Sequence, residues 1–96
     1  MTEHALIFPD GFDDYAWELE AKGCFSEARL FLSGKYYRLN FYDPVRLGQE
    51  IESELARGVF FFESNLVVLE VVTRPNMEKA VEELVKSNNI KLLTDE

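Results

Sequence analysis

Residues 28–44 read ARLFLSGKYYRLNFYDP, and this stretch decides the fold. Two apolar strand patterns flank the turn pair Ser33-Gly34, and Asp43-Pro44 then supplies a helix cap followed by proline at the first helical position. Residues 59–75, VFFFESNLVVLEVVTRP, repeat the arrangement, with Ser64-Asn65 at the turn 31 residues later. The spacing predicts two consecutive strand–strand–helix units.

Each unit ends in an amphipathic helix. In the first, Leu47, Ile51 and Leu55 recur at helical spacing and Gly58 follows as a stop signal. The second helix has a longer apolar stripe at the same spacing. Its members are Met77, Ala80, Val81, Leu84 and Val85.

These patterns predict one α+β domain over residues 1–96, with an antiparallel sheet in ββαββα order and two helices on one face. The domain comprises an acidic N-terminal segment (1–27), a first ββα unit (28–58) and a second (59–96). A ferredoxin-like βαββαβ order over Tyr36–Leu93 is the variant. In that variant 28–32 and Ile90–Leu93 compete for one place in the sheet. The short turn favours 28–32, and Ile90–Leu93 remains a possible edge strand.

Side-chain alternation sorts the two faces of the expected sheet. Leu30, Leu32, Tyr37, Leu39 and Phe41 in the first hairpin, and Phe60, Phe62, Val67, Leu69 and Val71 in the second, are assigned beneath the helices. The opposite face remains apolar in the second hairpin and needs a cover. The interface residues expected on it are Val59, Phe61, Leu66, Val68 and Val72.

The N-terminal segment is the first choice for that cover, because it carries aromatic residues beside its acids. Over 13–21 it fits either a capped helix ended by Gly23 or an alternating strand, and helix propensity favours the former. A homodimer is the second choice for covering the sheet.

The chain is strongly acidic, with a net charge of −8 over 96 residues. Residues 1–27 hold seven acids and one base, so most of the charge belongs to this segment. Such a surface repels phosphate backbones and anionic lipids, so neither nucleic acid nor membrane is expected as a partner. A lone cysteine, Cys24, forms no internal disulfide and indicates the cytoplasm.

Residue types that carry common catalytic chemistry are scarce. The chain has one histidine, His4, and one cysteine, so it almost lacks the residue types that form metal clusters and nucleophile–histidine pairs. Cys24 near Lys22 is interpreted as a small buried residue rather than a reactive thiolate. No enzymatic activity, cofactor or metal is predicted.

Arg29 and Arg38 are the best candidates for a binding site. If Ser33-Gly34 is the turn, they lie directly opposite each other, where like charges require an anion. An internal acid, either Glu70 or one from the N-terminal segment, is the favoured explanation. A bound anionic ligand is the alternative. Tyr36, Asn40 and Tyr42 are the neighbours expected to contribute hydrogen bonds and stacking.

The composition therefore favours a non-catalytic cytoplasmic module that works through protein–protein contact, either with itself or with a basic partner. A small sensor of anionic ligands using Arg29 and Arg38 is the alternative function.

Overall fold

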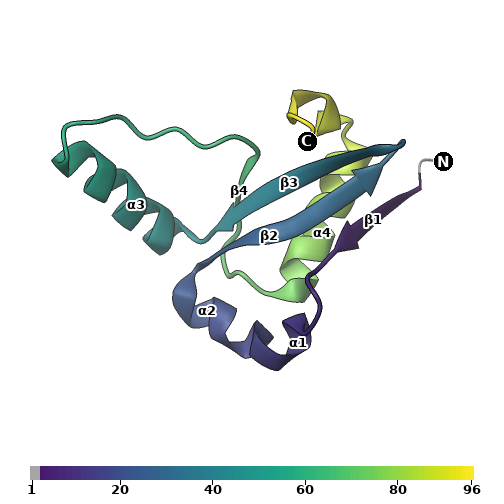
Figure 1. Ribbon diagram of the computed structural model, residues 1–96, viewed down its shortest axis with the longest axis horizontal. Coiled ribbons are helices and arrows are strands. Elements are labelled where there is room, and N and C mark those ends of the chain that lie inside the picture. Colours follow the sequence, from purple (N-terminus) through teal and green to yellow (C-terminus); the bar gives the residue numbers. More distant parts are fainter. Residues whose placement is uncertain (1–2) are drawn as a thin grey trace.

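The sheet is mixed and contains four strands. The computed structural model describes residues 3–96, so the first two residues of the acidic segment lie outside it. The spatial order is β1-β2-β3-β4, with three antiparallel strands and β4 parallel to β3 (Figure 1). The strands are β1 (His4–Ile7), β2 (Cys24–Leu32), β3 (Lys35–Tyr42) and β4 (Leu66–Val68). The α+β class is thus confirmed, whereas the antiparallel sheet is only partly so.

The helices occupy three different places around this sheet. In Figure 1, α4 lies behind the strands, the α1–α2 segment lies at one end, and α3 projects away from the body. Their bounds are α1 (Phe12–Tyr15), α2 (Leu19–Lys22), α3 (Pro44–Ala56) and α4 (Arg74–Lys86), with 3₁₀ turns η1 (Ala16–Glu18) and η2 (Asn89–Leu92).

The first hairpin forms as the sequence predicts. Ser33 and Gly34 both have positive φ, 51° and 78°, as a type I′ turn requires. The resulting register places Arg29 opposite Arg38 and directs Leu30 and Leu39 to the face under α4. The first unit is therefore encoded locally.

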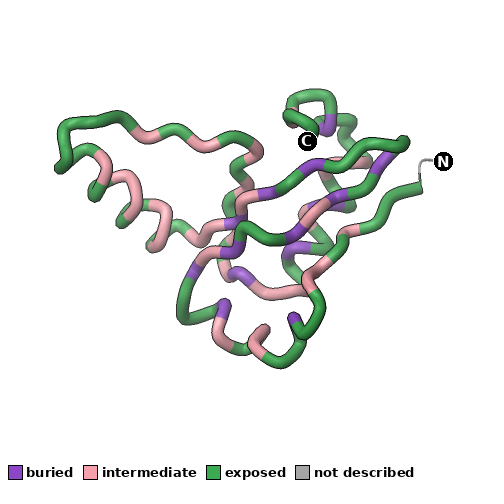
Figure 2. Tube along the Cα trace, in the orientation of Figure 1, coloured by how far each residue is buried: buried purple, intermediate pink, exposed green. Residues whose placement is uncertain are grey.

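The core lies between this face of the sheet, α4 and the N-terminal helices (Figure 2). Met77 and Val81 from α4 are almost fully buried against the strands, as the helical stripe predicts. Thirteen buried hydrophobic residues form one cluster, which fits a single small domain. They are Phe12, Leu19, Phe25, Ala28, Leu30, Leu32, Tyr37, Leu39, Phe41, Val72, Met77, Val81 and Ile90.

The second hairpin does not form, and this is the main departure from the prediction. Of the expected strands 59–63 and 66–72, only Leu66–Val68 is a strand, and it pairs with β3 in parallel. Asn65 alone has positive φ in the Ser64-Asn65 pair, whereas a two-residue type I′ turn needs positive φ twice. The chain therefore does not reverse here. It continues along β3, with Asn40 N donating to Asn65 O at 3.0 Å.

The expected faces of the second unit change as a consequence. Phe60 and Phe62, assigned beneath the helices, are 78% and 77% exposed. Val72, assigned to the opposite face, is fully buried in the core because strand alternation ends at Val68. No residue of α3 is buried, so of the two helices expected to cover the sheet only α4 does so.

The N-terminal segment also packs differently from the prediction. Its first part is β1, an edge strand, residues 12–22 form α1, η1 and α2, which end at Gly23, and residues 24–27 already belong to β2. Phe12 packs against Phe25 with ring centroids 5.1 Å apart, on the same face as α4. Arg74 of α4 forms an ion pair with Asp13 at 3.0 Å. The segment therefore adds to the helix side and does not lie across the opposite face.

The ferredoxin-like variant is not confirmed, because strands that are neighbours in the sheet follow one another in the sequence. Ile90–Leu93 is not a strand, since 89–92 forms η2 and buries Ile90. The place beside the first part of β3 is instead taken by residues 94–96, with Glu96 N donating to Tyr36 O.

The start of α3 is fixed against the end of α2. Asp43 caps the helix by accepting from Arg46 N at 2.7 Å, and its own N–H donates to Gly23 O at 2.8 Å. A Cβ at Gly23 would lie 2.6 Å from an Asp43 carboxylate oxygen and 2.9 Å from Arg46 Cβ. Gly23 also has a positive φ of 72°. Glycine is therefore required at this junction by both conformation and space.

We expect Gly23→Ala to lower the free energy of unfolding by about 2–4 kcal/mol, because left-handed strain and a steric clash combine. Gly34→Ala is the matched control, since Gly34 has a similar φ but no atom within 4 Å of its added Cβ. It should lose only about 1–2 kcal/mol. Urea denaturation measures both changes in the free energy of unfolding. Equal losses would show that the contact of the added Cβ at position 23 with Asp43 and Arg46 does not destabilise the fold.

Candidate functional site

The most unusual part of the molecule is an arm formed by residues 44–63. It consists of α3 and the return segment 57–63, which runs back beside it toward β4 (Figure 1). The arm lengthens the molecule to 44 Å, and the radius of gyration is 13.9 Å. A compact domain of this length has a radius of gyration of about 12.5 Å.

The arm exposes large apolar side chains that a folded monomer normally buries. Phe60 and Phe62 are the most exposed phenylalanines, and Val45 is 71% and Leu55 58% exposed. Val45, Glu52 and Leu55 are all exposed and lie within about 80° of one another around the axis of α3. Exposed apolar clusters of this kind mark association sites in soluble proteins.

The backbone of the return segment is also unsatisfied within residues 3–96. Val59 N donates to Glu54 O at the end of α3, but the N–H groups of 60–63 have no protein acceptor in the described chain. An extended segment with free backbone donors and acceptors is suited to pairing with another strand or packing beneath a partner.

Two polar contacts anchor the return of the arm to the sheet. Tyr42 Oη donates to Glu63 at 2.8 Å, and Asn40 Nδ2 donates to Ser64 O at 2.8 Å. Burial, and then the hydrogen bond to Glu63, raises the pKa of Tyr42 above its usual range. These two residues were expected to contact a ligand, but their polar groups contact the protein itself.

Asn65 completes the anchor. Its side-chain amide donates to Arg38 O at 2.9 Å and to Thr94 O at 2.8 Å, and its Oδ1 accepts from Thr94 N. One residue therefore joins β3, the start of β4 and residues 94–96.

The reverse face is the side of the sheet away from α4, and it is open. β-register assigns to it Ile7, Arg29, Phe31, Tyr36, Arg38, Asn40, Tyr42, Leu66 and Val68. Of the five expected interface residues, only Leu66 and Val68 lie here. Val59 and Phe61 belong to the arm, and Val72 is in the core.

Arg29 and Arg38 face each other on this surface, and the anion beside Arg29 is an internal acid. Arg29 Nε and Nη2 donate to Glu96 at 2.8 and 3.2 Å, while its guanidinium lies 4.4 Å from the Tyr36 ring centroid. The sequence analysis expected this acid to be Glu70 or a residue of the N-terminal segment, but it is Glu96. The hydrogen bond from Arg29 lowers the pKa of the Glu96 carboxyl. Arg38 forms no ion pair within residues 3–96.

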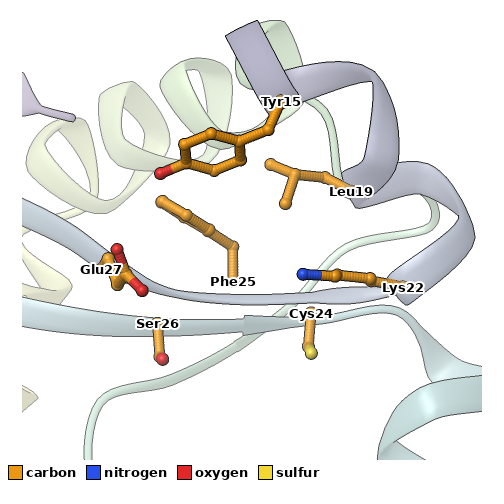
Figure 3. Close-up of a pocket in the computed structure, with 7 residues that line it drawn as sticks. All are labelled: Tyr15, Leu19, Lys22, Cys24, Phe25, Ser26 and Glu27. Carbon is orange, nitrogen blue, oxygen red and sulfur yellow. The ribbon is translucent and has the colours of Figure 1, made fainter. Parts of the chain in front are cut away.

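A shallow cavity of about 490 Å³ adjoins these arginines. Asp10 and Glu27 line it together with Arg29 and Arg38, so its charges are mixed. A second cavity, of about 420 Å³, lies between α2 and β2. Figure 3 shows Tyr15, Leu19 and Phe25 facing one another there, whereas Cys24 and Ser26 project from the other side of the strand. Lys22 and Glu27 also line this second cavity, but within residues 3–96 neither forms a side-chain hydrogen bond with Cys24 or Ser26.

Metal-ligating side chains are also dispersed. Over residues 3–96, no three His, Cys, Asp or Glu residues lie close enough to hold an ion. In the same part of the chain, none of the helices has the length and apolarity needed to span a bilayer.

Sequence reasoning predicted Val59 and Phe61 as interface residues but missed the other apolar residues of the arm. It placed Phe60 and Phe62 in the core, and it buried the stripe that contains Leu55. The signal that was available is the absence of glycine from Ser64-Asn65, which weakens the hairpin assignment.

We expect the Glu96 carboxyl to titrate below its ordinary value of 4.5 and to return toward it in Arg29→Met. Because the folded pKa is depressed, the pair stabilises the fold above the unfolded pKa, and the contribution disappears as pH falls through the folded pKa. NMR titration of the carboxyl carbon measures the shift. An unchanged Glu96 pKa in Arg29→Met would contradict the assignment.

No protein-family model matches the chain, and no curated protein or solved structure is significantly similar to it.

Proposed function

We propose that this protein is a non-catalytic protein–protein interaction module and that the arm is its contact element. The observation that carries the proposal is the exposure of Phe60 and Phe62, together with unpaired backbone groups in the same segment. Aromatic side chains are enriched in protein interfaces, so two exposed phenylalanines two residues apart are suited to be anchors.

The construction of the arm supports this role. Its base is held by Asp43 at one end and by Tyr42 and Asn65 at the other. Anchoring at both ends limits the conformational entropy lost when a partner binds. Both ends of the arm are therefore held in place before a partner binds.

The negative charge of the chain favours selective binding over nonspecific association. A net charge of −8 keeps copies of an exposed apolar surface soluble and disfavours polyanionic partners. The lone Cys24 suits a reducing compartment, and we therefore propose a cytoplasmic location.

We expect Phe60→Ser/Phe62→Ser to weaken partner binding at least tenfold, because both side chains lose their apolar contacts. The free energy of unfolding should change by less than about 0.5 kcal/mol, since the residues pack against little. Trp17→Ser and Leu92→Ser are matched controls, as these side chains are 75% and 76% exposed but lie outside the arm.

Binding is measured by affinity capture from cell lysate with quantitative mass spectrometry and by sedimentation of the purified chain. If the arm variant captures and self-associates as the wild type does, the arm is not the contact element. If the control variants lose binding equally, exposed apolar surface in general is responsible.

The second candidate function is a sensor of small anions at Arg38, with Arg29, Tyr36, Asn40 and Tyr42 around it. It is favoured by one observation, which is that Arg38 lines a cavity and has no ion pair in residues 3–96. It is weakened by Glu96, which already neutralises Arg29.

For this alternative we expect inorganic phosphate or a dicarboxylate to raise the unfolding temperature, because the anion would bind only the folded state. The gain should disappear in Arg38→Ala. Differential scanning fluorimetry measures it, with chloride at equal ionic strength as the control. No stabilisation by either anion would exclude the sensor.

A further inference from the structure

We propose that the partner of the arm is a second copy of this chain, and that each subunit lays its arm across the reverse face of the other. This inference rests on the proposed function, since it names the partner of the same contact element. The two chains then form a closed, two-fold symmetric dimer with two identical contacts, each between the arm of one subunit and the reverse face of the other.

The distribution of exposed apolar residues supports a reciprocal exchange. Residues 3–96 expose twelve large hydrophobic side chains, and ten of them lie on two surfaces, five on each. The arm carries Val45, Leu55, Val59, Phe60 and Phe62, and the reverse face carries Ile7, Phe31, Tyr36, Leu66 and Val68. A second copy covers both surfaces and leaves neither exposed. A partner that binds the arm alone leaves the reverse face bare.

The topology supplies an independent reason. A helix that connects two parallel strands normally packs on their sheet, because it buries its apolar stripe there. Here α3 connects β3 to β4, yet its start is fixed at Gly23 and Asp43 so that it points away from its own sheet (Figure 1). A helix of a second copy supplies the missing layer. Exchange of an element between identical chains needs no new surface chemistry.

Charge complementarity fixes the expected contact. On the arm, Arg46 pairs with Glu50 and Arg57 with Glu54, at 2.8 and 3.3 Å, and Glu63 accepts from Tyr42 Oη. Glu52 has neither an ion pair nor a side-chain hydrogen bond within residues 3–96. On the reverse face, Arg38 is the arginine without such a pair there, because Arg29 binds Glu96.

Glu52 lies between Val45 and Leu55 on the outward side of α3. When this side packs on the reverse face, Glu52 is the acid that reaches Arg38 of the second copy. The dimer therefore contains two Glu52–Arg38 pairs.

The test uses the full chain and two charge reversals, Glu52→Arg and Arg38→Glu. Each variant alone should self-associate about 100-fold more weakly than the wild type, because each of its two symmetric contacts then brings like charges together. An equimolar mixture of the two variants should restore wild-type association. In the mixed dimer, one contact is native and the other is the same ion pair with its charges exchanged.

Sedimentation velocity across a concentration series measures the association constant, and native mass spectrometry identifies the mixed dimer through a small mass tag on one variant. Circular dichroism verifies that each variant is folded, and restoration by mixing excludes misfolding as the cause of any loss. Glu82→Arg is the control reversal, since Glu82 is an exposed residue of α4, outside both surfaces, and like Glu52 forms no ion pair within residues 3–96.

Three results would overturn the proposal. These are a monomer at all concentrations, a dimer that is insensitive to both reversals, and variants whose association mixing does not restore. The first result is also expected if each arm folds onto its own sheet. A monomer whose capture of another protein requires Phe60 and Phe62 would overturn this inference alone and leave the proposed function standing.

Discussion

The crossover between β3 and β4 is anchored at both ends, and the rest of the structure depends on this constraint. At the first end, Asp43 caps α3 and donates to Gly23 O. At the second, Asn65 bonds to β3 and to residues 94–96. Residues 44–64 connect these two anchors. Because the start of α3 is held in a fixed direction, this connection leads away from the sheet. Loop-closure entropy grows slowly with length, so such an excursion costs little once both ends are held.

The excursion leaves the molecule with two open surfaces. The core is complete without α3, because α4, the N-terminal helices and one face of the sheet bury thirteen hydrophobic residues together. The apolar side chains of the arm and of the reverse face lie outside this buried cluster, although Phe31 and Tyr36 still pack against each other with ring centroids 5.0 Å apart. Burying their exposed part would gain about 25 cal/mol per Å² of apolar surface removed from water. This is why both the function and the partner proposed here centre on these surfaces.

Polar residues on the reverse face are mostly engaged in holding the fold. Tyr42 and Asn40 bind the return of the arm, and Arg29 binds Glu96. Such contacts satisfy groups that would otherwise compete for ligands. Arg38 is left as the charged group available to a partner. The reverse face thus combines apolar side chains with Arg38, which lies beside the cavity lined by Asp10 and Glu27.

The sequence by itself determined the first ββα unit, the amphipathic α4 and the acidic character of the chain. These features are local, because a two-residue turn with positive φ, a proline after a cap, and an apolar stripe act within a few residues. Only the tertiary structure decided the second unit. Ser64-Asn65 does not enforce a reversal, so the free backbone edge of β3 captured β4 in parallel and the phenylalanines of 59–63 were left outside. Glu96 in turn reached Arg29 across 67 residues, a distance over which no sequence pattern specifies a contact.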